Sequence, residues 1–300
     1  MDRFLAMQVF VAVGEEQGFA AAARRLGLSP PMVTRTIGAL ERQLGVKLLQ
    51  RTTRIVRLTT AGARYLLDCK RLLSEVDDAE QALSGSQTEL RGPLSITASV
   101  MFGRLFVAPI LLEFLAHHPK VDGRAVFVDR VADLIEEGLD VGVRIAHLAD
   151  ASFTAIRVGA VRQILCASPA YLKRHGVPQT PRDLSEFDAI SFSADRAAPA
   201  WSFGTGKRAL SVRPRSRLVV NSSEVAMQAA IAGAGLTRVL SYMAASELKA
   251  GRLRVILSEF EPEAIPIHVI HREGKHAAAR VRAFVDLTVD RLRRHPLLKS

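Results

Sequence analysis

Two short segments with helical spacing, separated by a glycine, constrain the fold of this chain more than any other feature. Residues 19–26 are rich in alanine, and Gly27 permits the turn that follows them. Ser29 can cap the next helix, and Pro30 suits its first position, where a missing N–H costs nothing. A buried stripe on that helix is predicted by apolar residues spaced four, three and four apart, namely Val33, Ile37, Leu40 and Leu44.

The opposite face of this helix carries small and cationic residues. At about 100° per residue, the side chains that point away from the stripe are Pro31, Arg35, Gly38 and Arg42, with Thr34 on the flank. A solvated surface would explain such a face on an isolated helix. After a short helix and a glycine turn, however, it is typical of a helix-turn-helix, whose second helix enters the DNA major groove. Small residues allow close approach to base edges, and arginine can bind guanine or phosphate.

A hairpin is predicted directly after this helix. Residues 47–50 and 55–58 favour strands, and the turn between them carries Arg51 and Arg54. Cations at a hairpin tip suit contact with phosphates or with the minor groove, and a solubilising loop is the alternative.

The basic charge of the chain is concentrated at this end. Up to Leu67 there are ten Arg and Lys residues against four Asp and Glu, whereas the whole chain has a formal net charge of +11. More than half of the excess therefore lies in less than a quarter of the chain. Such asymmetry indicates a nucleic-acid-binding end.

A longer helix is predicted after Thr59 or Thr60, either of which can cap it. Its apolar residues alternate at four and three, as in a two-chain coiled coil: Tyr65, Cys69, Leu72, Val76, Ala79 and Leu83. Packing on the chain's own domain is the alternative. Because a DNA reader usually needs a twofold partner to reach half-sites about 34–36 Å apart, we favour a dimer helix. The polar residues 84–93 mark a domain boundary.

Strands and helices alternate after Gly92, which predicts parallel α/β layers. The first series comprises strands at 94–99, 123–129 and 140–145 and helices at 103–119 and 131–139. A second series runs from about Arg162 to Glu261, and a strand from about Ile267 with a closing helix returns to the first. Two similar lobes with a late return leave a cleft between them.

Ligands of open α/β sheets bind beyond the carboxyl ends of strands, often on helix N-termini. This rule selects six residues as lining, with the only tryptophan of the chain as a lid or wall: Ser99, Val100, Met101, Arg144, Asn221 and Thr237, with Trp201. Helix capping is the alternative for Ser99 and Asn221, a surface position for Arg144, and a core position for Trp201. Exposed helix N-termini together with an arginine would suit an anionic effector.

The N-terminal motifs resemble those of the LysR-type transcriptional regulators. The ordered pattern AARRLGLS, then VTRTIGALERQLGVKL, then RTTRIVRLTTAG is highly specific. The similarity continues through residues 92–111, 133–148, 233–242 and 265–286, so that it covers nearly the whole chain.

The resemblance implies an α/β protein with three parts. These are a winged helix-turn-helix in residues 1–58, a linker or dimerisation helix and hinge in 59–91, and a two-lobed effector domain like a periplasmic binding protein in 92–300. Lobe 1 is expected at about 92–161 and 267–300, and lobe 2 at about 162–266. Members are commonly tetramers that bind palindromic promoter DNA and respond to a small molecule.

On the family pattern, the expected DNA contacts are Pro30, Pro31, Thr34 and Arg35, with Arg51 and Arg54 from the wing. Two departures from that pattern affect which operator is read. Gly18-Phe19-Ala20 stands where many members carry Ser-Phe-Thr, and Pro30 stands where many carry Gln.

Other constellations point away from an enzyme, a metal or a cofactor. Gly233-x-Gly235 follows a helix and lacks the third glycine of a dinucleotide fingerprint, and His117 and His118 point different ways. The two cysteines have neither metal nor redox spacing. With neither a secretory signal nor an apolar run of about 18 residues, we expect a cytoplasmic protein. The alternatives are an α/β enzyme or solute-binding protein with an accidental basic N-terminus, and an architectural DNA binder with an inactive sensor.

Overall fold

The computed structural model describes residues 2–51, 56–83, 89–148, 153–193, 199–206, 209–271 and 277–299. The chain divides into two compact units. The first comprises residues 1–93 with 135–138, and the second comprises residues 94–134 with 139–300.

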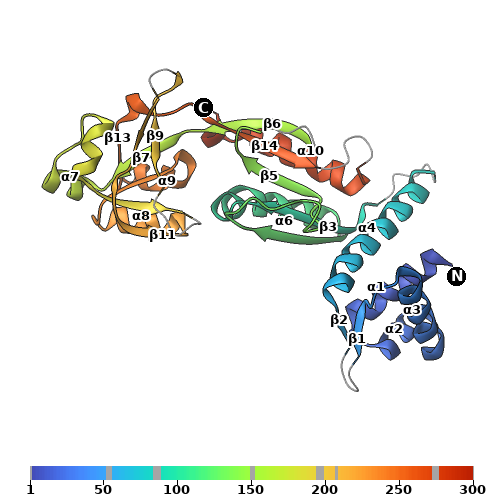
Figure 1. Cartoon of the computed structure of the whole chain (residues 1–300). Helices are drawn as coiled ribbons and strands as arrows, with labels where there is room; N and C mark the ends of the chain where they lie inside the picture. The colour runs from blue at the N-terminus through green and yellow to red at the C-terminus, as the bar shows by residue number, and fades with distance from the viewer. Residues whose placement is uncertain are drawn as a thin grey trace. The chain divides into compact units, whose positions relative to one another are not determined.

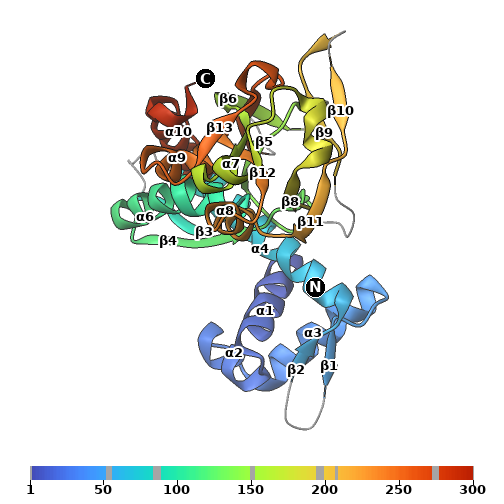
Figure 2. The same ribbon diagram turned by 90° about the vertical axis from the view of Figure 1, so that its left-hand side faces the viewer.

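The first unit combines three short helices, a hairpin and a long helix (Figure 2). Ser29 caps the third helix, because its Oγ accepts a hydrogen bond from the Met32 N–H at 3.4 Å. The second helix occupies residues 19–26, and the third begins directly after Ser29, both as the sequence predicts. The elements are α1 Arg3–Glu16, α2 Phe19–Leu26, α3 Pro30–Leu44, β1 Leu49–Arg51, β2 Val56–Leu58 and α4 Thr60–Leu83.

One apolar core holds these elements together. Phe10 of α1 and the predicted stripe residues Val33, Ile37 and Leu40 of α3 are buried in it. Cys69 is buried in the same core and Tyr65 packs against it, so the first two residues of the predicted coiled-coil seam contact their own domain. Farther along α4, Val76 is 37% exposed. A partner helix could therefore contact only the later part of the seam.

The second unit has two lobes, each with a five-stranded sheet (Figure 1). In lobe 1 the strand order is β4-β3-β5-β14-β6, and α10 packs against α6 and β6. The elements of lobe 1 are β3 Arg91–Ala98, α5 Val100–Phe102, η1 Gly103–Val107, α6 Ala108–His117, β4 Lys120–Phe127, β5 Val141–Ile145, β6 Thr154–Val161, β14 Ile265–His271, α10 Ala279–Arg294 and η6 Pro296–Leu298.

Lobe 2 has the strand order β11-β8-β12-β7-β13, with α8 packed against four of these strands. A separate hairpin of β9 and β10 contributes Trp201 and Phe203 to the lobe 2 core. The elements are β7 Gln163–Ala167, α7 Pro169–His175, η2 Pro181–Glu186, β8 Asp188–Phe192, β9 Trp201–Phe203, β10 Leu210–Val212, β11 Arg215–Val220, α8 Ser223–Ile231, β12 Leu236–Leu240, α9 Ser241–Lys249, β13 Arg254–Ile256 and η4 Ser258–Phe260.

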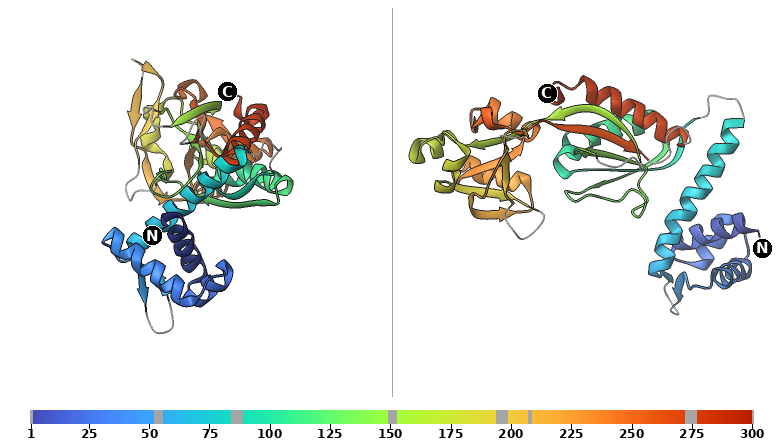
Figure 3. Two further views of the ribbon diagram at one scale, coloured as in Figure 1. Left: turned by 90° about the vertical axis from the view of Figure 1, so that its right-hand side faces the viewer. Right: turned by 45° about the horizontal axis from the view of Figure 1, so that its top comes forward.

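Both sheets are mixed, so the expectation of parallel layers holds for part of each sheet: β3 pairs parallel with β5, and β8 pairs parallel with β11 and β12. In lobe 1, β14 pairs antiparallel with β5 and β6, and in lobe 2, β7 pairs antiparallel with β12 and β13. The cause is the path of the chain, which leaves lobe 1 along β6 and comes back along β14 (Figure 3). A strand that retraces this path runs opposite to its neighbour.

The predicted helix at residues 131–139 is also absent, and turns take its place. Ala132, Leu134 and Leu139 are buried in a small core with Ile270, whereas Val131 is 81% exposed, so the segment buries part of its apolar side chains without forming a helix.

A continuous helical stretch, Val100–His117, forms the main helix of lobe 1. It has 18 residues and a mean hydropathy of 1.6, which makes it, within the described residues, one candidate for a membrane span by length and composition. We expected no apolar run of about 18 residues from the sequence, and this stretch contradicts that expectation. Phe102, Val107 and Phe114 bury one side of it in the protein, as in the core helix of a soluble domain. The middle of the stretch, Gly103–Val107, is a π-helical turn.

Gly62 lies where the wing meets α4, and it leaves no room for a side chain. A Cβ atom at residue 62 would lie 1.9 Å from the backbone oxygen of Leu48. Thr59 fixes this approach, because its hydroxyl donates to the Lys47 oxygen at 2.8 Å and accepts from the Gly62 N–H at 2.9 Å.

We therefore expect Gly62→Ala to lower the free energy of unfolding by about 1–3 kcal/mol, since a backbone must move. Gly38→Ala is the matched control. A Cβ atom there meets nothing nearer than an Arg42 side-chain nitrogen at 3.7 Å, so alanine should raise stability by about 0.5–1 kcal/mol. Urea denaturation of the full chain followed by circular dichroism measures both changes. Equal stability of the two variants would show that the approach of Gly62 to the Leu48 backbone does not exclude a side chain.

Candidate functional site

The outward face of α3 brings together four of the residues expected to contact DNA. Pro30, Pro31, Thr34 and Arg35 are all exposed, while Val33 between them is buried. The side chains thus divide as the 100° spacing predicts. The capped N-terminus of this helix and its cationic face form an exposed surface, to which Met32 adds a large apolar side chain that is 41% exposed.

A buried carboxylate joins α3 to the wing, the hairpin of β1 and β2. Glu41 accepts hydrogen bonds from the backbone N–H groups of Leu48 and Leu49 at 3.0 and 3.2 Å, and from Lys47 Nζ at 2.7 Å. Burial opposes the charge of Glu41, but these hydrogen bonds outweigh it and lower the pKa of the carboxyl below its ordinary value. The wing therefore starts at a fixed position relative to α3.

The wing itself is only partly described. Arg51 is the last residue of β1 and pairs with Val56, and the position of its side chain is not described. Arg54 lies outside the described residues. Arg57 on β2 is exposed opposite Gln50 and adds a described cation to the hairpin.

A second group of residues meets where the two lobes join. Ser99 follows β3 directly, and Val100 and Met101 begin the next helix, as predicted. The ring of Tyr242, at the start of α9, contacts Phe102 and Phe106 edge-on, with centroids 5.3 and 5.5 Å apart. These rings hold the first turns of the lobe 1 helix against lobe 2.

Two hydroxyl groups at this junction are buried without a hydrogen-bond partner in the part of the chain that the structure describes. They are Ser99 Oγ and Tyr242 Oη. Burial raises the pKa of the Tyr242 phenol, the nearby Ser99 hydroxyl opposes that rise, and the charge of Asp129 adds to it. Asp129 Oδ1 accepts the Val100 N–H at 3.0 Å. Buried polar groups normally have partners, and the partner within reach of each of these hydroxyls is the other, since the Ser99 hydroxyl already acts on the Tyr242 phenol.

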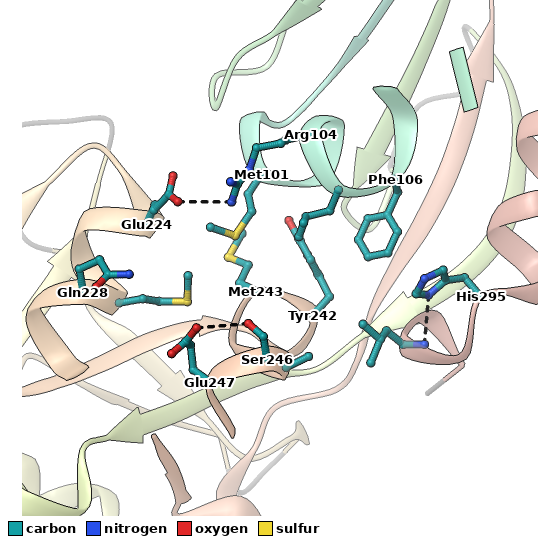
Figure 4. A pocket seen from close by; sticks show the side chains of 14 residues that line it. Met101, Arg104, Phe106, Glu224, Gln228, Tyr242, Met243, Ser246, Glu247 and His295 are labelled. Carbon is teal, nitrogen blue, oxygen red and sulfur yellow. Dashed lines mark hydrogen bonds and ion pairs between the residues drawn. The ribbon is translucent and has the colours of Figure 1, made fainter. Parts of the chain in front are cut away.

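Tyr242 also lines a cavity of about 290 Å³ between the lobes, which we call the junction pocket (Figure 4). Arg104 from lobe 1 pairs with Glu224 of lobe 2 at 3.4 Å across it. The rest of the wall is formed by apolar and polar side chains from both lobes. These are Met101, Leu105, Phe106, Met227, Gln228, Met243, Ala245, Ser246, Glu247, His295 and Leu297.

Of the predicted ligand residues, Met101 lines this pocket, and Ser99, Val100, Arg144, Asn221, Thr237 and Trp201 do not. Arg144 donates to the Ala132 oxygen at 2.6 Å and lies over the Phe153 ring at 5.7 Å. Asn221 is exposed, and its neighbour Ser222, rather than Asn221, caps α8.

Trp201 and Thr237 lie inside lobe 2, and we do not retain them as ligand residues. Trp201 is 3% exposed and belongs to the core, because its hairpin folds over the sheet. Thr237 is fully buried, and its hydroxyl donates to the Ile190 oxygen at 3.0 Å. Position after a turn or in an aromatic segment does not reveal which side of a sheet a residue faces.

Sequence reasoning missed Tyr242, Asp129, Glu224 and Glu247. The rule of strand ends could have found Tyr242, which stands two residues after β12, and Asp129, which stands two residues after β4. The two glutamates lie on α8 and α9, and their sequence surroundings give no signal.

Within the described residues, neither a metal-binding cluster nor a reactive thiol adds to these two surfaces. Among the described residues there is no cluster of three His, Cys, Asp or Glu side chains that could hold a metal ion. Burial raises the pKa of the Cys69 thiol to about 11 and that of Cys166 to about 12, so both stay protonated and unreactive at neutral pH.

Comparison with known proteins relates both units to one family. Residues 4–63 match the family model of the bacterial regulatory helix-turn-helix protein, lysR family, and residues 87–293 match that of the LysR substrate binding domain. An HTH-type transcriptional repressor of Pseudomonas aeruginosa (strain UCBPP-PA14) is 33% identical over 298 residues, which cover 99% of this chain and 94% of the relative. The transcriptional activator AaeR of Escherichia coli (strain K12) is 31% identical over 97% of this chain and 94% of the relative.

Solved structures agree with these matches. CrgA, a LysR-type transcriptional regulator from Neisseria meningitidis, is 27% identical with a TM-score of 0.61, and the match covers 96% of this chain and 98% of that one. The virulence activator AphB of Vibrio cholerae has the same fold, with a TM-score of 0.61, 24% identity and coverage of 96% and 99%.

The buried carboxylate yields a test of the first surface. Glu41→Gln keeps the size of the side chain but removes the charge that accepts three hydrogen bonds. We expect it to lower the free energy of unfolding by about 1–3 kcal/mol near neutral pH. Because the folded protein lowers the pKa of Glu41 from its ordinary 4.5, this stabilisation is present above pH 4.5 and disappears as the pH falls through the folded-state pKa.

Urea denaturation of wild type and variant across this pH range measures the difference. Lys47→Gln, which removes only an exposed partner, serves as the control and should cost less than about 1 kcal/mol. A loss for Glu41→Gln that stays constant down to the lowest pH would show that the carboxylate charge is not what joins α3 to the wing.

Proposed function

Because this chain belongs to the family of LysR-type transcriptional regulators, we propose that it binds promoter DNA as a homo-oligomer through α3 and the wing and changes that binding when a ligand enters the lobe junction. It is a transcriptional regulator with a helix-turn-helix domain and an effector-binding domain, and its family is one of regulators rather than enzymes. The observation that carries the proposal is the exposed, capped and cationic face of α3 at the end of the chain where basic charge is concentrated.

For DNA contacts we propose Pro30, Pro31, Thr34 and Arg35 on α3, with Arg51 and Arg54 from the wing. A helix that enters the major groove presents its N-terminal residues to base edges, and all four α3 residues lie within its first six positions. Cations of a hairpin reach phosphates or the minor groove beside it.

We propose the domain limits 1–58, 59–91 and 92–300, and dimers that associate through the later part of α4 and assemble further into tetramers. Exposure of Val76 on the predicted seam supports the first step. Membership of a family of DNA-binding regulators supports a location in the cytoplasm, where promoters are accessible.

As ligand residues we propose Ser99, Val100 and Met101, with Tyr242 facing them from lobe 2. Arg144 and Asn221 remain candidates for the periphery of the ligand site. A ligand that binds one arrangement of the lobes better than another shifts the population between the two arrangements. The change in DNA affinity can be no larger than this difference in ligand affinity.

The DNA surface is tested by Arg35→Ala in gel-shift titrations with a promoter fragment. If Arg35 reads a base, the substitution should weaken binding by about 1–3 kcal/mol and relax specificity at one base pair. Wild-type affinity should fall steeply with salt, with a log–log slope of about −0.9 for each neutralised phosphate. Arg213→Ala, an exposed cation of lobe 2, controls for the loss of net charge and should leave affinity unchanged. Undiminished binding by Arg35→Ala would remove this residue from the interface.

The dimer proposal is tested by Val76→Glu. A charge at the centre of an apolar seam should dissociate the oligomer, and light scattering coupled to size-exclusion chromatography should then report the mass of a smaller species. Ala63→Glu, an exposed position of α4 outside the seam, is the control and should keep the wild-type mass. If both variants keep that mass, α4 is not the dimer contact.

A further inference from the structure

The first turn of α3 offers no free backbone N–H group. Pro30 and Pro31 lack this group. The Met32 N–H donates to the hydroxyl and carbonyl oxygens of Ser29, at 3.4 and 3.0 Å, and the Val33 N–H donates to the same carbonyl oxygen at 3.1 Å. Proteins often use the N–H groups of a helix N-terminus to bind DNA phosphates. In this helix the first turn must contact DNA through its side chains instead.

These side chains are exposed and apolar. Pro30 and Pro31 are exposed, and Met32 is 41% exposed although it is a large apolar residue. None of the three side chains has a strong hydrogen-bond donor or acceptor. A single exposed apolar residue is ordinary on a protein surface. Three in succession, at the start of the helix that we propose to enter the major groove, form an apolar end, and we call residues 30–32 the α3 tip.

The major groove of DNA presents one apolar group among its hydrogen-bond donors and acceptors, the 5-methyl group of thymine. An apolar side chain can favour a base pair there by packing against this methyl group and removing it from water. Met32 suits this contact best within the α3 tip, because its side chain is long and unbranched and its thioether is polarisable. The chemistry of the tip therefore favours thymine over guanine, which side chains bind through hydrogen bonds.

Cations beside the α3 tip supply the attraction to DNA that the tip itself lacks. Arg35 is exposed, as are Arg42 farther along the same helix and Arg57 on the wing. Arginine binds phosphate or the edge of guanine. Because Met32 and Arg35 are three residues apart, they are neighbours on the helix surface. The base that Met32 contacts and the group that Arg35 binds should therefore lie close together on the duplex.

We propose that Met32 is a specificity-determining residue and that the α3 tip selects a thymine by its 5-methyl group. The Met32 thioether packs against this methyl group, the two proline rings border it, and Thr34 and Arg35 contact polar groups beside it. This inference rests on the proposed binding of promoter DNA and states which base the first turn of α3 reads.

The test uses a duplex that the wild-type full chain selects from a random pool, and measures affinity by gel-shift titration. Replacing each thymine in turn by deoxyuridine removes one methyl group and keeps the hydrogen-bonding edge of the base. We expect at least one thymine in each half-site at which this change weakens binding about threefold to fourfold, the loss expected for one buried methyl group. A cytosine at the same position should also bind weakly, and 5-methylcytosine should recover part of the affinity.

The assignment to Met32 comes from repeating these titrations with variants. Met32→Ala should bind the thymine and deoxyuridine duplexes alike, whereas Met32→Leu, which keeps a large apolar side chain, should retain most of the preference. Val46→Ala is the matched control, because Val46 is 42% exposed in the same unit but follows the end of α3. It should keep the full preference for thymine. All three substitutions are at exposed positions, and melting temperatures establish that the variants fold.

Two results would overturn the proposal. One is equal binding of thymine and deoxyuridine at every position, and the other is an undiminished preference for thymine in a folded Met32→Ala variant. Wild-type affinity for the selected duplex, measured as a function of salt, separates these results from failure of the proposed function. A chain that binds with a steep salt dependence but gives either result loses only the role of Met32, whereas a chain that selects no duplex loses both proposals.

Discussion

The double crossing of the chain between the lobes is the constraint on which the response of this protein depends. Arg162 alone separates β6 of lobe 1 from β7 of lobe 2, and the chain returns along β14. Backbone and ionic contacts hold the crossing in place: the Ser241 N–H donates to the Arg162 oxygen at 2.8 Å, and Arg162 pairs with Glu261 at 3.4 Å. Two adjacent strands permit the lobes to rotate but not to separate. The junction pocket lies between the parts that rotate, so whatever fills it acts on the angle between the lobes.

The DNA-binding unit is organised by a different kind of interaction. Glu41 lies on the buried face of α3, whereas Arg35 lies on its exposed face. The Glu41 carboxylate accepts hydrogen bonds from the backbone of Leu48 and Leu49, at the start of the wing. The helix that presents Arg35 thereby also positions the first residues of the wing. Gly62 allows α4 to approach the backbone of Leu48, the residue whose N–H binds Glu41. The long helix that would carry the dimer contact therefore starts from a position that the wing defines.

Local signals were sufficient for much of this fold. The bounds of α2 and α3 follow from apolar spacing, an N-cap serine and glycine stops, and the exposed face of α3 follows from helical geometry alone. Features that depend on distant segments were not predictable. The antiparallel β14 pairs with strands more than a hundred residues earlier, and the apolar residues of 131–139 pack against Ile270 of that strand without forming a helix. Trp201 and Thr237 share this cause, since each takes its place from a partner far away in sequence.

The π turn at Gly103–Val107 takes up one residue more than a regular helix would use. The Ala108 N–H bonds the Gly103 oxygen, five residues back, so one turn of the helix is wider than its neighbours. Because the wide turn absorbs the extra residue locally, the segments on either side keep the phase of a regular helix. The first turn thus faces lobe 2 while Phe114 of α6 stacks edge-on against Phe284 of α10. A chain with one residue fewer at this place would form a regular helix and present the same two faces.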